Sequence, residues 1–495
     1  MNLAHLIDGH PADQVAIISR GRPTTYGVLR DQVAHLRGGL AGLGVGSGDR
    51  VGIVCSNGRY FVDTYLAVLG LGAVAVPLNP IGAAPEIQRE LAAVEASVVV
   101  VDAAGSNTWR SVDTGKLPSL TAVVSTEGDI PGAVPFADLL TAEAVPTVDV
   151  DPGTLAALMF TSGTAGAPHA AMLSHGNLLA NLEQSRDSGN GIVPDDVVYG
   201  VLPMFHIFGL NVVLGQTLLN GATVVLVQRF DPSTALDTIR DRQVTVVPGA
   251  PPMWVAFSAF DAAPADSFAS VRLALTGAAA MPEEAMRRVE ERFGLVLREG
   301  YGLTEAAPVV TSSAGIDARY GSVGKVLGRM EVRLVDESGD DVAVGEAGEV
   351  WVRGPNVFHG YWREPELSAK VITADGWLRT GDIATVDADG YLYITDRAKD
   401  LIIVNGFNVF PAEVEEVLRE HPAVAEVGVI GVAHPLTGEA VKAFVVLKPG
   451  LDLDEEQLIG WCSDHLARYK CPNKVLFVDQ LPRNVSGKLL RRELV

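Results

Sequence analysis

Residues 161–169 read TSGTAGAPH and follow the apolar run Leu155–Phe160. Glycine permits turns in which several backbone N–H groups point inward, and hydroxyl side chains add donors, so a loop of this composition can hold a polyphosphate. The loop differs from the phosphate loop of kinases and GTPases, because it contains no Gly-Lys-Ser/Thr. Taken alone, it fits a polar surface turn as well as it fits a phosphate site.

Three later motifs favour the phosphate site. They contain carboxylates, Glu305 and Asp382, and carboxylates in general bind Mg²⁺ together with phosphates and accept hydrogen bonds from paired hydroxyls. Each motif alone also fits an exposed turn, a surface salt bridge or a solvated lysine. The motifs are GYGLTE at Gly300–Glu305, WLRTGD at Trp377–Asp382 followed by DRAKD at Asp396–Asp400, and PRNVSGK at Pro482–Lys488.

Together the four motifs resemble those of the adenylate-forming superfamily, which includes acyl-CoA and aryl-CoA ligases, luciferases and the adenylation domains of peptide synthetases. The resemblance covers almost the whole chain, from Thr24 to Lys488. The family's usual loop is TSGTTG-x-PKG, and this chain departs from it at Ala165, His169 and Ala170. Replacing Lys with His exchanges a permanent positive charge for a group that is mostly neutral at pH 7. We therefore expect weaker ATP binding or slower turnover rather than loss of function.

The resemblance implies four catalytic residues and a magnesium ligand. Lys488 neutralises charge that develops during adenylation, Thr304 contacts phosphate, and Glu305 holds Mg²⁺. His206, within PMFHIFG, borders the acyl pocket and helps to orient the carboxylate, although an isolated histidine in an apolar segment is more often a core residue.

The resemblance also implies which residues bind ATP and CoA. The aromatic Tyr301 stacks near adenine, Asp382 holds the ribose, and Arg397 contacts ribose or phosphate. Lys399 matches the hinge about which a C-terminal domain rotates between the two half-reactions. The cofactor-binding residues implied are Thr161, Ser162, Gly163, Thr164, Gly166, His169, Gly277, Ala278, Tyr301, Gly302, Asp382, Arg397, Lys399, Gly406, Phe407, Arg468 and Lys470.

Composition limits the classes of partner. The chain has 495 residues and a net charge of −22, so we expect no nucleic acid and no anionic membrane surface as partner. Three cysteines without metal-ligand spacing indicate a reducing compartment. Without a signal peptide or an apolar run long enough to span a bilayer, the protein is expected to be cytoplasmic. A basic segment over 468–495 is either a solvated face or a contact for CoA phosphates.

Hydrophobic patterning predicts an α/β fold. Helical patterns at Tyr26–Leu40 and Phe61–Leu71 alternate with short apolar runs at Arg50–Val54 and Ala73–Pro77, which is typical of parallel sheets with covering helices. A further helix is expected at Gly209–Leu219. After about residue 320, short strands with Gly turns indicate a β-rich subdomain. The predicted domains are 1–396, an N-terminal AMP-binding domain, and 397–495, a small mobile α+β lid domain.

The predicted reaction joins a small-molecule carboxylic acid, ATP and CoA to give acyl-CoA, AMP and pyrophosphate through an acyl-adenylate. Transfer to a carrier protein is an alternative, although only seven residues follow Lys488. A second alternative is an impaired sensor that only binds nucleotide or acyl-adenylate. A fatty acid is placed slightly ahead of an aryl acid, and a homodimer is left open.

Overall fold

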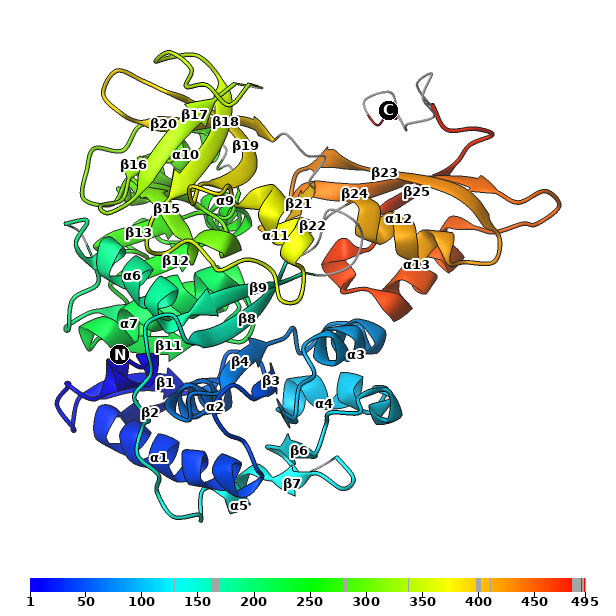
Figure 1. The fold of residues 1–495 in the computed structure, drawn as a ribbon. Coiled ribbons are helices and arrows are strands. Elements are labelled where there is room, and N and C mark those ends of the chain that lie inside the picture. Colours follow the sequence, from blue (N-terminus) through cyan, green and yellow to red (C-terminus); the bar gives the residue numbers. More distant parts are fainter. Residues whose placement is uncertain are drawn as a thin grey trace.

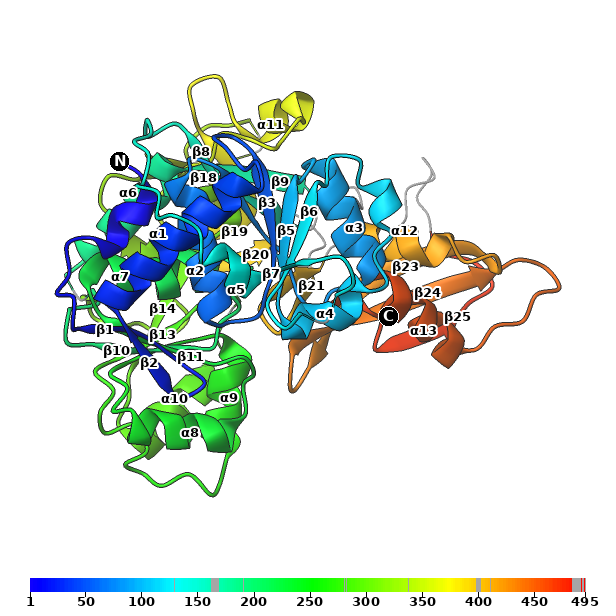
Figure 2. The ribbon, with the colours of Figure 1, turned by 90° about the horizontal axis from the view of Figure 1, so that it is seen from below.

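The computed structural model describes residues 1–128, 130–161, 169–189, 191–279, 281, 283–336, 338–397, 402–409, 411–482, 491 and 494. Two large sheets with helices packed between and around them form most of the chain, and a smaller α+β unit lies to one side (Figures 1 and 2). The predicted α/β class, with a β-rich subdomain and a smaller C-terminal unit, is confirmed.

The first large sheet has seven strands, and most of them are short and rich in Val, Ala or Leu. Strands that are buried on both faces read as continuous apolar runs, which is why Val98–Val101 is fully buried. The strands are β3 (Arg50–Val54), β4 (Val74–Pro77), β5 (Val98–Val101), β6 (Ala122–Ser125), β7 (Val134–Pro135), β8 (Leu155–Thr161) and β9 (His169–Ser174). Their order is β7-β6-β5-β3-β4-β8-β9, and only β8 and β9 pair antiparallel.

The second large sheet has nine strands and carries most of the site. They are β1 (Val15–Ser19), β2 (Arg22–Thr25), β10 (Val197–Gly200), β11 (Thr223–Leu226), β12 (Val246–Gly249), β13 (Leu273–Thr276), β14 (Leu297–Gly302), β15 (Val309–Ser312) and β16 (Lys325–Val326). The order is β16-β15-β14-β13-β12-β10-β11-β1-β2. Parallel strands β10, β12, β13 and β14 point their carboxyl ends the same way, and ligands of α/β proteins bind at that edge.

Helices cover and separate these sheets. The longest, α1 (Tyr26–Gly42), starts after Thr25, whose side chain accepts a hydrogen bond from the Val28 N–H, and it buries Leu29, Val33, Leu36 and Leu40. The others are α2 (Arg59–Gly70), α3 (Ala84–Ala93), α4 (Ala103–Trp109), α5 (Phe136–Leu139), α6 (His175–Arg186), α7 (Gln216–Asn220), α8 (Pro232–Asp241), α9 (Pro251–Ala259), α10 (Glu283–Phe293) and α11 (Pro365–Val371), with one-turn 3₁₀ helices η1 (Leu3–Ile7), η2 (Thr114–Lys116) and η4 (Thr304–Ala306).

The predicted helix at Gly209–Leu219 takes a different form. Residues Phe208–Gly215 form a π-helix, η3, which continues into α7. The Asn211 side chain donates to the carbonyl oxygens of Leu178 (3.2 Å) and Ala307 (2.7 Å). Apolar periodicity does not distinguish a π-turn from an α-turn, and π-turns are frequent at functional sites.

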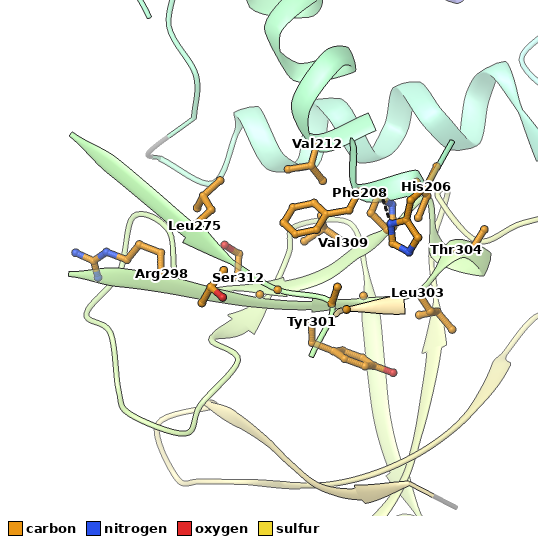
Figure 3. Close-up of a pocket in the computed structure, with 18 residues that line it drawn as sticks. His206, Phe208, Val212, Leu275, Arg298, Tyr301, Leu303, Thr304, Val309 and Ser312 are labelled. Carbon is orange, nitrogen blue, oxygen red and sulfur yellow. Dashed lines mark hydrogen bonds between the residues drawn. The ribbon is translucent and has the colours of Figure 1, made fainter. Parts of the chain in front are cut away.

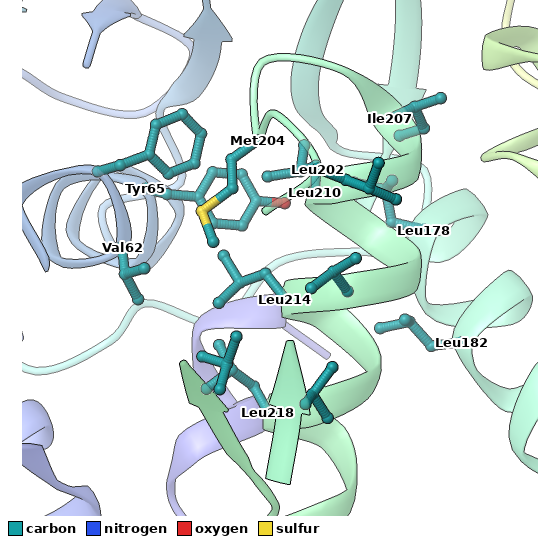
Figure 4. Packing of buried hydrophobic residues seen from close by; sticks show 14 of the residues in the cluster. Val62, Tyr65, Leu178, Leu182, Leu202, Met204, Ile207, Leu210, Leu214 and Leu218 are labelled. Carbon is teal, nitrogen blue, oxygen red and sulfur yellow. The ribbon is translucent and has the colours of Figure 1, made fainter. Parts of the chain in front are cut away.

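The main core lies between the two large sheets (Figure 4). Val62 and Tyr65 of α2 face Met204, Leu214 and Leu218, while Leu178 and Leu182 of α6 close the other side. This packing fixes the backbone on both sides of His206. The buried Asn57 adds three hydrogen bonds there, donating to Gly200 O and Leu202 O and accepting from the Met204 N–H.

The β-rich subdomain is a four-stranded antiparallel sheet: β17 (Glu331–Val335), β18 (Gly348–Arg353), β19 (Leu378–Val386) and β20 (Leu392–Arg397). The C-terminal unit contains β21 (Ile402–Val404), β22 (Phe407–Val409), α12 (Pro411–Arg419), β23 (Val424–His434), β24 (Gly438–Leu447), α13 (Glu455–His465), η5 (Arg468–Lys470) and β25 (Lys474–Phe477). Its buried apolar cluster begins at Ile402 and, among the residues that the structure describes, contains none from the large sheets. The domain boundary near 396 stays a prediction.

Within the described ranges, no helix is both long and apolar enough to cross a bilayer.

Candidate active site

Two cavities meet at His206 and Thr304. The inner cavity, with an empty volume of about 750 Å³, runs along β14 beside the carboxyl end of β13 (Figure 3). It is lined by Phe208, Val212, Leu275, Arg298, Tyr301, Val309 and Ser312, among others. The outer cavity, of about 730 Å³, lies between α3 and η5 and is lined by Asn79, Glu86, Glu90, Thr161, Phe205, Phe407, Tyr469 and Lys470, among others. Of the residues that the structure describes, only His206 and Thr304 line both cavities. The two cavities are therefore neighbours at these residues.

His206 lies at this junction, as expected from the sequence. Its Nδ1 accepts a hydrogen bond from the Phe208 N–H at 3.3 Å, and its ring lies edge-on to Phe407. Burial penalises the charged form and lowers the pKa of His206 to about 4. With Nδ1 accepting, the neutral ring carries its proton on Nε2, so it can donate a hydrogen bond without adding charge.

The loop at Gly300–Glu305 brings predicted ATP ligands together. The Tyr301 hydroxyl donates to Oδ2 of Asp382 at 2.7 Å, although the two residues are 81 positions apart. Asp382 lies on β19 and is 9% exposed. The backbone of Arg397 on β20 pairs with Asp382, whereas the Arg397 side chain lies outside the described part of the structure.

Glu305 is positioned by a tyrosine that sequence reasoning did not single out for this role. The Tyr361 hydroxyl donates to Oε1 of Glu305 at 2.7 Å, and burial raises the pKa of Tyr361, with the Glu305 charge adding to the effect. The described residues contain no group of three or more His, Cys, Asp or Glu side chains that could hold a metal. Mg²⁺ usually binds one or two carboxylates plus phosphates, so a single Glu305 fits an ion that arrives with ATP.

The predicted phosphate loop is described only at its two ends. Thr161 ends β8, and His169 begins β9, so the loop joins two antiparallel neighbours. Ser162, Gly163, Thr164 and Gly166 lie outside the described residues. His169 is 9% exposed, and its Nδ1 lies 2.7 Å from Oε1 of Glu364, while its ring is tilted against Tyr361. The imidazole that replaces the family's lysine is thus already held by a carboxylate.

The C-terminal unit reaches the inner cavity through its β21–β22 hairpin. Gly406, with φ of +79°, packs against the Cβ atoms of Ala250 and Ala278, 3.4 and 3.6 Å from where its own Cβ would be. Its neighbour Phe407 stacks on Tyr469 with ring centroids 4.4 Å apart. Gly277 packs beside Phe208, since a Cβ there would lie 3.5 Å from that ring. Gly277, Ala278, Gly302, Gly406 and Phe407 are therefore all at the site or at its border.

Arg468 and Lys470 were expected to contact CoA phosphates, but their settings differ. Arg468 is exposed, whereas Lys470 is 5% exposed and its Nζ contacts Oε1 of Glu86 on α3 and, at 2.8 Å, Oε1 of Glu413 on α12. Burial opposes the charge of Lys470, but the two carboxylates outweigh it and raise its pKa. In this arrangement Lys470 is paired with two carboxylates, and a CoA contact stays a prediction for both Arg468 and Lys470. Lys399 and Lys488 lie outside the described residues.

Comparisons with known proteins place the chain in a family. The AMP-binding enzyme family matches residues 3–362, and the AMP-binding enzyme C-terminal domain matches residues 413–488. A feruloyl-CoA synthase from Amycolatopsis is 38% identical over 481 residues, covering 97% of this chain and 95% of the relative. A long-chain-fatty-acid–CoA ligase from Bacillus subtilis is 34% identical, covering 98% and 91%. The solved structure of the amide bond synthetase McbA from Marinactinospora thermotolerans, 32% identical, superposes with a TM-score of 0.89 and covers 100% of this chain and 99% of its own.

Proposed function

Because this chain belongs to the AMP-binding enzyme family, we propose that it is an acid–thiol ligase that makes acyl-CoA from a carboxylic acid, ATP and CoA. The observation that carries this proposal is the meeting of two cavities at His206 and Thr304. The proposal assigns the acyl group to the inner cavity, which Tyr301 also lines, and the thiol to the outer cavity.

In the first half-reaction, a carboxylate oxygen attacks the α-phosphorus of ATP, and the bond to pyrophosphate breaks. Asp382, held by Tyr301, would accept the ribose hydroxyls, and Glu305, held by Tyr361, would bind Mg²⁺ with the phosphates. His206, being neutral, can donate from Nε2 to a substrate oxygen without attracting the carboxylate into an ion pair. Lys488 and the loop at 161–169 are proposed to stabilise charge on the phosphates.

In the second half-reaction, the thiol sulfur attacks the acyl carbon, AMP leaves with the electron pair of the acyl–oxygen bond, and the thiol proton is lost. The outer cavity leads to this carbon from the side of Phe407 and Tyr469. Rotation of the C-terminal unit about Lys399 between the two half-reactions is part of the proposal.

CoA is our first choice of acceptor, and two alternatives have specific support. A carrier-protein phosphopantetheine arm has the same thiol chemistry. An amine is the second alternative, because the amide bond synthetase is a structural neighbour of this chain. Release of AMP with CoA, an acyl carrier protein or a panel of amines as acceptor separates the three.

We place an aryl acid ahead of a fatty acid, which reverses the order expected from the sequence. Phe208 lines the inner cavity, and an aromatic side chain can stack on a flat ring of the substrate. The feruloyl-CoA synthase relative supports an aryl acid, and the long-chain-fatty-acid–CoA ligase relative supports the alternative. Measuring CoA-dependent AMP release with aryl acids and with fatty acids of increasing length tests this order.

Lys488 gives a test of the half-reactions. We expect Lys488→Ala to abolish acyl-adenylate formation and to spare thioester formation from supplied acyl-adenylate. Survival of both half-reactions would remove the role assigned to Lys488. A protein that binds ATP but shows no pyrophosphate exchange with any acid would instead be the impaired sensor.

A further inference from the structure

Arg298 lies at the end of the inner cavity that is farthest from the reacting groups. Figure 3 shows Arg298, Leu275 and Ser312 at one end, and His206 and Thr304 at the other, with Phe208, Val212 and Val309 between them. Leu275 and Arg298 are register partners on the parallel strands β13 and β14, so both side chains leave the same face of the sheet.

The charge of Arg298 is not matched by a carboxylate in the part of the chain that the structure describes. Its Nη1 donates to the carbonyl oxygen of Ile316 at 2.5 Å, and no ion pair to it is formed among the described residues. A guanidinium carries five N–H donors, so it can make further hydrogen bonds. The half-buried Ser312 accepts from the Ala314 N–H at 3.0 Å through Oγ, which leaves its own proton available to donate.

The cavity between the two ends has apolar walls, formed by Phe208, Val212, Leu275 and Val309. A purely apolar acid would fill this space but would gain nothing from Arg298 and would take solvent away from it. An acid with an oxygen acceptor at its far end would fill the same space and would also receive hydrogen bonds there. Hydrogen bonds between a charged donor and a carboxylate are about twice as strong as those between neutral groups.

We propose that Arg298, assisted by Ser312, makes this site selective for compact acids that carry an acceptor oxygen at the end opposite the reacting carboxylate. A second carboxylate is bound best, then a ketone or a phenol oxygen. Arg298 and Gly302 are four residues apart on an extended strand, which corresponds to about 13 Å. This length fits an acid with one ring and a short chain. This inference rests on the proposed function and specifies its substrate.

Binding and activity of three acids of one skeleton test this inference: cinnamate, 4-hydroxycinnamate and 4-carboxycinnamate. In the wild-type protein we expect 4-carboxycinnamate to bind at least about tenfold more tightly than cinnamate by calorimetry, and kcat/KM for pyrophosphate exchange to follow the same order. Arg298→Leu should abolish the preference while leaving cinnamate binding within about twofold, since that acid does not use the guanidinium. Arg298→Lys should keep part of the preference for 4-carboxycinnamate, because a point charge remains.

Two controls separate the alternatives. Arg240→Leu, at an exposed arginine of α8, should leave all three dissociation constants unchanged. Ser312→Ala should reduce the preference less than Arg298→Leu does, and it serves as the second variant if Arg298→Leu does not fold. Equal binding of cinnamate and 4-carboxycinnamate by the wild type, or an equal loss for all acids in Arg298→Leu, would overturn the inference. Selective binding without any pyrophosphate exchange would overturn the proposed function and leave this inference standing.

Discussion

The Nδ1 atom of His169 lies 2.7 Å from Oε1 of Glu364, across 195 residues of sequence. The pair closes the end of the predicted phosphate loop against the segment that also carries Tyr361 and, through it, Glu305. Position 169 is therefore part of the network that positions the expected metal ligand, and its effect on ATP depends on Glu364 as well as on the histidine.

A lysine restored at position 169 should improve ATP binding, but Glu364 should compete with the phosphates for its charge. We expect His169→Lys alone to lower KM for ATP about threefold, and His169→Lys with Glu364→Gln to lower it about tenfold. The single variant Glu364→Gln is the control. If KM and kcat were unchanged in both lysine variants, the substitution at 169 would not be what limits ATP binding.

Removing the Tyr301 hydroxyl should affect ATP more than the acid. Tyr301→Phe deletes the hydrogen bond to Asp382, which is worth about 1.5–3 kcal/mol when one partner is charged, so KM for ATP should rise about tenfold or more. KM for the acid should change less than about twofold. Tyr391→Phe, which removes a hydroxyl bonded to Asp317 O, is the matched control. Equal increases in both KM values would show that the hydroxyl acts on the fold of the site instead.

The contact of Lys470 with Glu86 and Glu413 should stabilise the position of the C-terminal unit that forms the outer cavity. Its three side chains come from η5, α3 and α12, so it joins the C-terminal unit to the first large sheet's helices. Lys470→Met leaves two buried carboxylates without their cation, which disfavours this contact by several kcal/mol. We expect thioester formation from supplied acyl-adenylate to fall about tenfold or more, and adenylation to change less than about twofold.

Glu416→Gln, at an exposed position of the same helix α12, should leave both half-reactions unchanged. A parallel loss of adenylation and thioester formation in Lys470→Met would mean that the cluster stabilises the protein generally.

His175 should make the stability of the protein depend on pH. Burial lowers the pKa of its ring to about 4, and its Nδ1 accepts a hydrogen bond from the Leu3 N–H. The unfolded chain therefore binds a proton at pH 5 that the folded chain does not, so the stability due to neutral His175 is present at pH 7 and lost as the pH falls. The test compares the free energy of unfolding of the wild type with that of His175→Gln at both pH values. From pH 7 to pH 5, we expect the wild type to lose about 2 kcal/mol more than the variant does. A pH-independent difference would contradict the assignment of a neutral, buried ring.

The positions of helices and strands were easier to predict from the sequence than the hydrogen bonding within them. Tyr26–Leu40 has a clear helical period and ends in glycines, so α1 was predictable, and the strand predicted at Arg50–Val54 is β3. The π-turns of η3 were not predictable, because they depend on Asn211 bonding to Leu178 and Ala307, which lie far away in the sequence.

The site was predictable where a motif carried it and not where a lone residue did. Tyr301, Glu305 and Asp382 lie in motifs, and the structure brings Tyr301 to Asp382. By contrast, Glu364 and Arg298 have no local signal, since an isolated Glu or Arg in sequence is most often solvated. Lys470 had a basic neighbourhood in sequence but an acidic one in space, because Glu86 and Glu413 come from other elements.

Acid-dependent exchange of labelled pyrophosphate into ATP, followed by CoA-dependent release of AMP in the same mixture, tests the central claim most directly. The account predicts exchange that requires Mg²⁺ and a carboxylic acid, and AMP release in a one-to-one ratio with a thioester when CoA is added. ADP and phosphate as the products, or AMP release that does not depend on any acid, would contradict it.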